Sequence, residues 1–296
     1  MSFIAELQSA LGADASIITD ESITISYAKD QAPFADFAAP AAVLVARSVD
    51  EVSKALSIAN THGIAVVARG AGTGLSGGAN APAGSLVIAL EKMNQIIELD
   101  EKNLTATVQA GVINLDLDKA AAEKGLAYLP DPASREWSTI GGNAATNAGG
   151  MCCVKYGVTS QHIRSLKVVL ANGSVIQVGS KTKKGVAGLD LARLFIGSEG
   201  TLGIIVEVTV SLVPRPPKPS TLIATFPTIK QAASASIGLL SFSPSMLEIV
   251  DQTTIKAVED WHALGFETVG SILLMQSDDK STDLDKAQSL CESYGA

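Results

Sequence analysis

The stretch RGAGTGLSGGAN, residues 69–80, combines five glycines with a single charged side chain and follows the apolar run IAVVA. Glycine permits positive φ angles and lets other atoms approach the backbone closely. Successive free amides in such a loop form a concave site for an anion. The sequence therefore predicts a strand that ends in a phosphate-binding loop, and the structural alternative is a wide, glycine-rich turn.

Two well-known phosphate loops do not fit this stretch. A Walker A loop ends in Gly-Lys-Ser/Thr, and residues 69–80 contain no lysine. A Rossmann loop continues directly into a helix, whereas Pro82 and Gly84 exclude a helix at this point. We therefore expect the loop to join strand to strand and to hold a pyrophosphate through its amides alone.

The sequence around the loop alternates between helical and strand patterns. Ser48 and Glu51 form a capping box at the start of a helix that Gly63 ends, and Asn114 is the expected N-cap of a helix that Gly125 ends. The other expected elements are a short helix within residues 1–14, strands at 64–69, 85–90, 96–100, 104–112 and 201–213, a hairpin at 165–179 and a short helix at 189–195.

Two local predictions concern the middle of the chain. Asn172-Gly173 lies between two β-branched runs, and this pair is typical of a type I′ turn. Residues 129–161 are expected to be long and irregular, because they contain few large apolar side chains.

A proline-rich segment, PRPPKP at 214–219, predicts a linker or domain border, because proline withholds backbone donors and stiffens the chain. Beyond it, the strands TLIATF, SMLEIVD and SILLMQS alternate with helices near 228–240, 253–264 and 282–293, as in an α+β sandwich. A chain of 296 residues with 47% hydrophobic residues can form two units with sizeable cores.

Composition excludes several classes of protein. A net charge of −8 without a basic cluster argues against nucleic-acid binding. No uncharged apolar run approaches the ~18 residues of a membrane-spanning helix, and the N-terminus has no basic region of a secretory signal. Three cysteines, Cys152, Cys153 and Cys291, suit neither a disulfide framework nor a metal site, so we expect a reducing, cytoplasmic location.

Two more segments are rich in glycine and small polar residues. Residues 130–157 hold five glycines and few large apolar side chains, which suits a backbone wrapped closely around a ligand. Their Asn143 and Asn147 can donate and accept hydrogen bonds, as an isoalloxazine or ribose requires. Residues 197–208, GSEGTLGIIVEV, form a glycine-rich turn that enters a strand.

Together the three segments resemble the FAD-binding domain of the vanillyl-alcohol oxidase/PCMH flavoprotein superfamily. Within it, the similarity is to the FAD-linked 2-hydroxyacid dehydrogenases, which comprise the glycolate oxidase catalytic subunit, D-lactate dehydrogenase and D-2-hydroxyglutarate dehydrogenase group. RGAGTGLSGGA resembles the family's pyrophosphate loop, STIGGNAATNAGG with KYG its second flavin segment, and GSEGTLGII its third. SYAKDQAPF and PSMLEIVD also match, so the resemblance extends over residues 20–260.

The resemblance implies an α+β fold in two parts. Residues 1–214 would form a PCMH-type FAD-binding domain of two α+β lobes, about 1–98 and 99–214. Residues 220–296 would form a partial α+β substrate or cap domain with an antiparallel sheet. A partial cap leaves apolar sheet surface uncovered, so homo- or hetero-association or poor solubility is expected.

The resemblance also implies the residues that bind FAD. The diphosphate would be bound by Arg69, Gly70, Ala71, Gly72, Thr73, Gly74, Leu75, Ser76, Gly77 and Gly78. The flavin and ribityl would be lined by Pro130, Asp131, Ser134, Thr139, Gly141, Gly142, Asn143 and Asn147. The adenine side and ring edge would be closed by Glu199, Gly200, Thr201, Gly203, Ile204 and Ile205. The pyrophosphate loop has no histidine and SREWST has no cysteine, so the FAD is expected to be noncovalent.

The implied reaction is hydride transfer from the α-carbon of a D-2-hydroxy acid (glycolate, D-lactate or D-2-hydroxyglutarate type) to flavin N5, which gives the 2-oxo acid. Such a site needs a cation for the carboxylate and a base or metal-bound oxygen for the hydroxyl proton. His62, His162 and His262 lack metal spacing and suit structural roles. Arg135 can face a substrate carboxylate, a phosphate or solvent. The catalytic residues, the acid oxidised and the electron acceptor therefore stay unassigned.

Three hypotheses remain at this point. The chain is a fragment or short form of an FAD-dependent D-2-hydroxyacid dehydrogenase, or a flavin-carrying subunit that needs a partner chain to complete its active site. In the third, the glycine loops hold another nucleotide in a protein without redox activity. Peripheral attachment to a membrane is the alternative to a purely cytoplasmic location.

Overall fold

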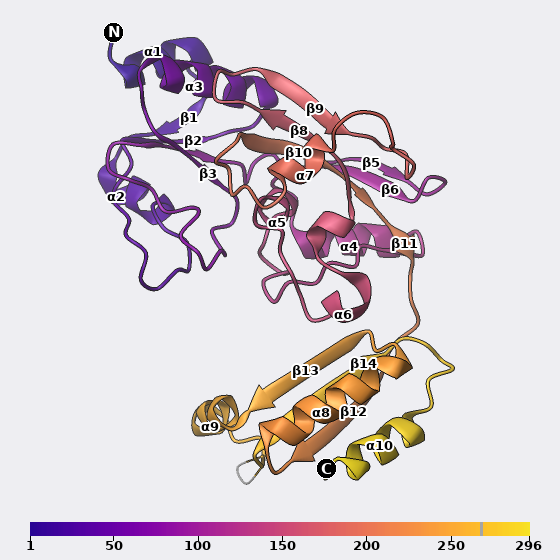
Figure 1. Cartoon of the computed structure of the whole chain (residues 1–296). Coiled ribbons are helices and arrows are strands. Elements are labelled where there is room, and N and C mark those ends of the chain that lie inside the picture. The colour runs from indigo at the N-terminus through magenta and orange to yellow at the C-terminus, as the bar shows by residue number, and fades with distance from the viewer. Residues whose placement is uncertain (267–268) are drawn as a thin grey trace. The chain divides into compact units, whose positions relative to one another are not determined.

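A computed structural model describes residues 1–266 and 269–296 (Figure 1). The chain divides into two compact units. The first unit contains Met1–Ala148 and Val158–Pro214, and the second contains Gly149–Gly157 and Arg215–Ala296. Among the described residues, no helix is long and apolar enough to span a membrane.

The first sheet of the first unit carries the glycine loop at the end of one strand. Its order is β1 (Ser16–Ile18), β2 (Ala42–Val45), β4 (Leu86–Ala89) and β3 (Val66–Arg69). β2, β4 and β3 are parallel, and β1 runs antiparallel to β2. All residues of β2 and β4 are buried, as is typical of central parallel strands. The loop does join β3 to β4, as expected.

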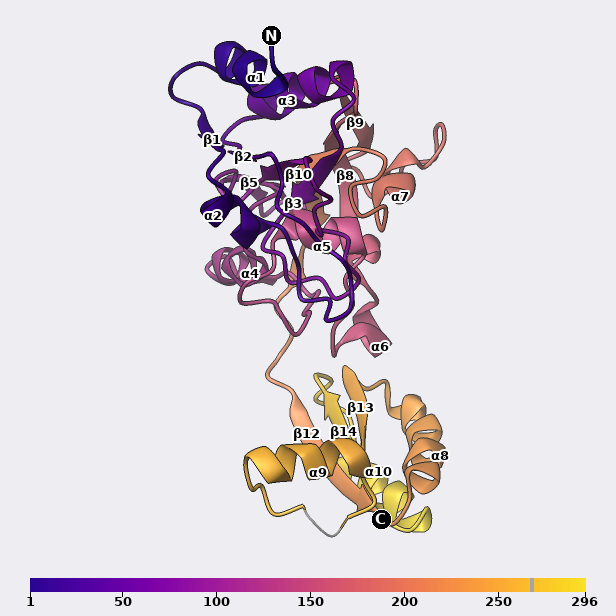
Figure 2. The same cartoon turned by 90° about the vertical axis from the view of Figure 1, so that its left-hand side faces the viewer.

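Two helices pack together and share one core with this sheet. They are α1 (Phe3–Leu11) and α3 (Val49–Thr61), which lie side by side in both views (Figures 1 and 2). The Ser48 side chain accepts the Glu51 amide at 3.2 Å, as the capping box predicts. The Glu51 carboxylate, however, accepts the amide of Arg47, one residue before the cap, at 2.8 Å. Gly63 follows with φ +65° and ends the helix.

The second sheet of the first unit is antiparallel throughout. Its order is β5 (Ile96–Asp100), β6 (Thr105–Gln109), β10 (Ile204–Ser211), β8 (Ile163–Val169) and β9 (Val175–Gly179). Ile204 and Val206 of β10 belong to the core of the first sheet, while Ile205 and Val208 belong to a second core. That second core also includes α4 (Asn114–Ala122), α5 (Ile140–Thr146) and α7 (Leu191–Phe195). β10 therefore links the two cores through the opposite faces of one strand.

Short elements complete the first unit. They are α2 (Glu21–Thr24), η1 (Ile25–Tyr27), η2 (Thr159–Gln161) and the pair β7 (Leu126–Ala127) with β11 (Val213–Pro214). The strand expected over 201–213 is therefore divided, with a break at Leu212.

Three local predictions from the sequence are wrong. Asn114 is the first helical residue of α4, with Ile113 at the N-cap, because its buried side chain donates to the Pro130 carbonyl at 3.1 Å instead of capping the helix. The hairpin turn is not type I′, since only Gly173 has a positive φ among Ala171, Asn172 and Gly173. The Gly173 amide donates to the Leu170 carbonyl, which fits a three-residue loop that ends in a glycine bulge.

The third error concerns residues 129–161. This region contains α5, the short helix α6 (Cys153–Tyr156) and η2, and is not irregular throughout. The small residues of α5 gave little helical periodicity, and tertiary packing stabilises the helix.

The second unit is an antiparallel sheet with helices. The strand order is β12 (Ser220–Phe226), β14 (Ser271–Ser277) and β13 (Met246–Asp251). α8 (Ile229–Leu239) and α10 (Leu284–Ser293) share the core on one face, and η3 (Leu240–Phe242) follows α8. α9 (Gln252–Trp261) and α6 pack against β13. On the other face, Ile223 is 53% exposed, and the expected association through this surface stays a prediction.

Candidate functional site

The three glycine-rich segments meet in the first unit. A Cβ on Gly70 would lie 2.5 Å from the Thr139 hydroxyl oxygen, so the first and second segments are in direct contact. A Cβ on Gly78 would collide with the carboxylate of Glu199, so the first and third segments are also neighbours. The second and third segments are joined by the Glu199 amide, which donates to the Ala145 carbonyl at 2.9 Å. Three segments, of which the first and the third are more than a hundred residues apart in sequence, therefore surround one place.

Asp30 holds the glycine loop in shape. Its carboxylate accepts the Gly77 amide at 2.9 Å, and its own amide donates to the Asn80 side chain at 2.8 Å. The Gln31 amide donates to the Gly74 carbonyl at 2.8 Å. Asp30 is 5% exposed. Sequence reasoning missed this residue, although it lies within the matching stretch SYAKDQAPF, because nothing local indicates which acid reaches the loop.

Arg69 places a positive charge beneath the loop. Its guanidinium donates to the Lys29 carbonyl at 2.7 Å and lies 5.9 Å from the centre of the Tyr27 ring. Burial lowers the pKa of Arg69, and the charge of Asp30 opposes this shift. Gly72 has φ +68°, and a Cβ there would come within 2.6 Å of the guanidinium carbon. The loop can therefore cross Arg69 only because residue 72 is glycine.

Most amides of the loop are left without a protein acceptor. Gly77 donates to Asp30, but within the described part of the chain the amides of residues 70–76 donate to no acceptor. Free amides beside an arginine provide the donors and the charge that bind an anion.

The second segment combines a helix start with a buried amide. Thr139 is the N-cap of α5, and its hydroxyl accepts the Gly142 amide at 3.1 Å. Gly141 packs on the end of β6, where a Cβ would lie 2.5 Å from the Ala110 Cβ. Asn143 is 3% exposed, and its Nδ2 has no partner among the described residues. Asn147 ends α5 in the left-handed region, and its Oδ1 accepts the Ser160 amide at 2.9 Å.

The turn before α5 holds the remaining residues expected in this segment. The Pro130 carbonyl accepts from Asn114, and the Ser134 carbonyl accepts the Ser138 amide at 2.7 Å. Asp131 is partly exposed in the same turn. Arg135 pairs through one guanidinium nitrogen with the carboxylate of Asp118 at 3.0 Å, while its buried Nε has no partner among the described residues, so its role toward substrate, phosphate or solvent stays a prediction.

The third segment contributes mainly backbone. Glu199 and Gly200 have φ of 50° and 81°, and the Thr201 hydroxyl donates to the Ser198 carbonyl at 2.6 Å. A Cβ on Gly203 would lie 2.7 Å from a Val168 methyl carbon. The side chains of Ile204 and Ile205, among those expected to close the site, are buried in the two cores described above. A ligand here would meet these two residues through their backbone.

Comparison with known proteins identifies this region. Residues 40–179 match the family model described as FAD binding domain. Residues 40–179 form an FAD-binding domain.

Relatives of this chain carry the names of oxidases and dehydrogenases. It is 45% identical over 260 residues to the glycolate oxidase subunit GlcD of Bacillus subtilis, a match that covers 86% of this chain and 55% of that protein. It is 36% identical over 245 residues to the D-lactate dehydrogenase of Anaerostipes hadrus, with 82% and 51% covered. A D-2-hydroxyglutarate dehydrogenase of Stutzerimonas stutzeri is 39% identical over 208 residues, with 70% and 44% covered. The chain thus spans about half the length of these relatives.

Solved structures share the fold of the FAD-binding chain at low sequence identity. An alkyldihydroxyacetonephosphate synthase superposes with a TM-score of 0.83 at 21% identity and covers 99% of this chain and 59% of that one. p-Cresol methylhydroxylase superposes with a TM-score of 0.80 at 20% identity, with 99% and 63% covered. The expected α+β fold, with a PCMH-type FAD-binding domain and an antiparallel sheet in the second part, is therefore confirmed.

The residues of the FAD-binding domain fit a dinucleotide. The free amides near Arg69 suit a diphosphate, which carries negative charge on closely spaced oxygens. The unpartnered Nδ2 of Asn143 is a buried donor, and leaving it without an acceptor is costly. A bound group with a carbonyl or hydroxyl oxygen would satisfy it.

The histidines have structural surroundings. His62 Nε2 lies 2.8 Å from the Glu6 carboxylate, and His262 lies beside Trp261 with 6.2 Å between ring centres. His162 is buried against Tyr128 with ring centres 6.2 Å apart. Burial raises the pKa of Tyr128. Across residues 1–266 and 269–296, no group of three His, Cys, Asp or Glu side chains could hold a metal ion.

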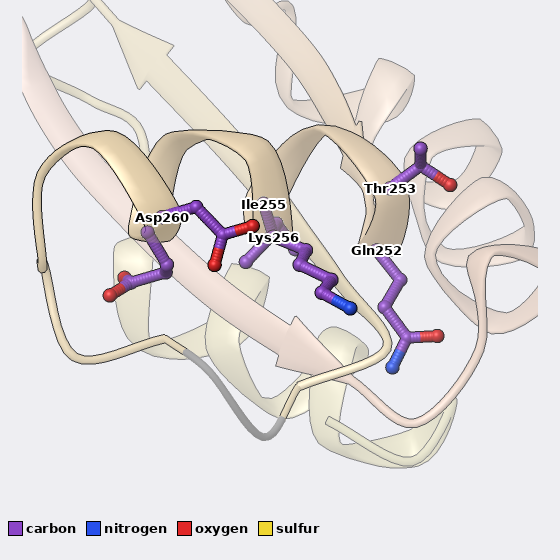
Figure 3. Close-up of a pocket in the computed structure, with 6 residues that line it drawn as sticks. Gln252, Thr253, Ile255, Lys256 and Asp260 are labelled. Carbon is purple, nitrogen blue, oxygen red and sulfur yellow. The ribbon is translucent and has the colours of Figure 1, made fainter.

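A hollow in the second unit is not a convincing second site. It runs along α9 and is lined by Gln252, Thr253, Ile255, Lys256, Glu259 and Asp260 (Figure 3). All six residues come from one helix, whereas binding sites bring together polar groups from several elements. The Glu259 carboxylate is already engaged by the amides of residues 264–266.

Proposed function

We propose that the three glycine-rich segments bind a single FAD noncovalently. The observation that supports this most directly is the double contact of the first segment, at Gly70 with Thr139 and at Gly78 with Glu199. In this proposal residues 70–78, through those of their amides that are free, and the charge of Arg69 bind the diphosphate. Asn143 donates to an oxygen of the flavin or ribityl, and the turn at 199–203 closes the opposite edge.

We further propose that the chain takes part in the oxidation of a D-2-hydroxy acid of the glycolate, D-lactate or D-2-hydroxyglutarate type. The support is its similarity to three relatives with these names. When bound, FAD supplies the hydride acceptor for such a reaction. The chain's own contribution is to place the flavin and to compensate the diphosphate charge. Residues 1–214 are the proposed FAD-binding domain, with lobes at about 1–98 and 99–214, and residues 220–296 are the proposed cap.

A second candidate is an FAD-binding part that needs further chain for catalysis. Oxidation of a hydroxy acid needs a cation for the carboxylate and a group that takes the hydroxyl proton. In the part of the chain that the structure describes, one guanidinium nitrogen of Arg135 is paired with Asp118, and no cluster suits a metal. In this second candidate, a partner chain would supply the cation and the proton acceptor.

Spectroscopy separates these proposals. The purified chain is incubated with FAD, desalted and scanned in the visible range, and then glycolate, D-lactate or D-2-hydroxyglutarate is added without oxygen. Bleaching by glycolate, or by D-lactate or D-2-hydroxyglutarate and not by the L-enantiomer, supports the complete oxidoreductase. A retained flavin spectrum that no acid bleaches supports the second candidate. Protein that stays colourless in excess FAD contradicts both.

A further inference from the structure

Residues 149–157, which we call the strap, belong to the second unit although the residues before and after them belong to the first. The strap lies inside the 40–179 match to the FAD-binding family, and the chain on both sides of it belongs to the first unit. The strap itself belongs to the compact second unit. The chain therefore passes between the units at both ends of the strap as well as at the proline-rich linker.

The two ends of the strap are joined within the first unit. The Ala148 carbonyl accepts the Thr159 amide at 3.1 Å and the Thr159 hydroxyl at 2.7 Å. The Ser160 amide donates to the Asn147 side chain at 2.9 Å, and the Ala148 amide donates to the Asn143 carbonyl at 2.9 Å. We call this group of bonds the neck. The neck fixes the C-terminal end of α5. This helix carries Asn143, whose side chain is the proposed donor to FAD.

The tip of the strap is fixed by one carboxylate. Asp278, immediately after β14, accepts from both Lys155 and Tyr156. The Asp278 side chain is 6% exposed and that of Lys155 is 30% exposed. A carboxylate this deeply buried is costly without partners, so release of the strap would leave an unpaired buried charge. Burial alone would raise the pKa of Asp278, but the bonds from Lys155 and Tyr156 outweigh it and lower the pKa.

We infer that Asp278 is a positioning residue for the flavin site: by holding Lys155 and Tyr156 it anchors the strap, and the anchored strap keeps the neck and the end of α5 in the form that binds FAD. The inference rests on the proposed function, because it takes Asn143 as a contact of FAD. It goes beyond the site itself, since Asp278 belongs to the second unit and its bonds to the second glycine-rich segment go to Lys155 and Tyr156, which are not among the residues expected to bind FAD.

The test compares four variants of the full chain with the wild type. Asp278→Asn and Lys155→Met break the charged pair, and Lys155→Arg keeps it. Asp285→Asn, an exposed acid of the same unit, is the matched control. Two quantities are measured: amide hydrogen exchange over 140–148 and 149–157 without FAD, and the rate at which bound FAD dissociates.

We expect D278N and K155M to accelerate exchange in the strap by about tenfold or more, which corresponds to loss of a charged hydrogen bond. Exchange over 140–148 and FAD release should rise together by about threefold to tenfold. K155R and D285N should stay near the wild type. If D278N does not fold, the comparison of K155M with K155R is sufficient to test the inference, because both variants keep the buried carboxylate of Asp278.

Two results would overturn the inference. In one, the amides of the strap exchange faster while exchange over residues 140–148 and the rate of FAD release are unchanged. The bonds of Asp278 with the strap would then affect only the strap itself. In the other, the strap is insensitive to both variants. Hydrogen exchange without FAD tests whether the strap and residues 140–148 are coupled, even if the wild type binds no FAD. A wild type that binds no FAD would contradict the proposed function separately.

Discussion

The hydroxyl oxygen of Thr139 lies 2.5 Å from the position that a Cβ would take on Gly70. The same hydroxyl accepts the Gly142 amide and caps α5. One atom therefore starts the helix of the second segment and sets how closely the glycine loop can approach it. The contact makes the shape of the proposed flavin site depend on the absence of a side chain at residue 70.

Gly70→Ala should damage this contact. We expect a loss of about 1–3 kcal/mol in the free energy of unfolding, because the new methyl overpacks against Thr139. FAD affinity should fall as well, since the loop must move away from α5. Chemical denaturation and FAD titration measure the two effects.

The control for G70A is Gly185→Ala. A Cβ at Gly185 meets only the Ser180 Cβ, at 3.7 Å, and the residue has no positive φ. We expect a change within about 0.5 kcal/mol there. Equal effects of the two substitutions would show that the Thr139 contact has no special role.

Asn143→Ala should weaken FAD binding with little cost to the protein without FAD. The Nδ2 has no partner among described residues, so its removal breaks no protein hydrogen bond. We expect about tenfold weaker FAD binding, the equivalent of one hydrogen bond. Isothermal titration measures the affinity, and Asn60→Ala, an exposed asparagine on α3, is the control. Unchanged affinity in N143A would remove Asn143 from the site.

Tyr128→Phe should stabilise the protein. The Tyr128 hydroxyl is buried and has no partner in the described structure, and an unsatisfied buried polar group costs about 1–3 kcal/mol. We expect a gain of about 1 kcal/mol in the free energy of unfolding at neutral pH. The control is Tyr294→Phe, at a residue that is 38% exposed. A loss of stability in Y128F would mean that the hydroxyl is bonded in solution.

The alkaline behaviour of Y128F should also differ. Burial raises the pKa of Tyr128 above that of the unfolded chain, which is about 10. Above that pH the unfolded state releases a proton that the folded state keeps, so the wild type loses stability as pH rises. Y128F lacks this contribution, and its unfolding free energy should fall less steeply above about pH 10. Identical slopes would contradict the raised pKa.

The flavin should separate from the protein on acid precipitation. The first segment has no histidine and SREWST has no cysteine, so neither of the attachment residues used by flavin-linked relatives is present. After precipitation and centrifugation, absorbance near the flavin maximum should appear in the supernatant. Yellow colour retained in the washed pellet would establish a covalent bond and contradict the prediction.

Much of the fold was predictable because its signals are local. The α3 helix follows from Ser48, Glu51 and Gly63, and the strand-to-strand loop follows from Pro82 and Gly84. Asn114 was misjudged because its side chain makes a contact outside its own helix instead of a cap. The turn at Asn172 was misjudged for a local reason, since a three-residue loop that ends in a glycine bulge takes the place of a type I′ turn. Asn114 binds Pro130, and Gly173 next to Asn172 accepts from Ser53 of α3 at 2.6 Å.

The sequence by itself determined where glycine lets the backbone adopt positive φ, where apolar periodicity forms strands and helices, and that three glycine-rich segments exist. Only the tertiary structure decided that Asp30 accepts the Gly77 amide, that Asp118 pairs with Arg135, and that Asp278 pairs with Lys155 of the strap. The physical reason is that backbone propensity depends on each residue and its neighbours, whereas the pairing of a charge depends on which distant group approaches within a few ångströms once the core has formed.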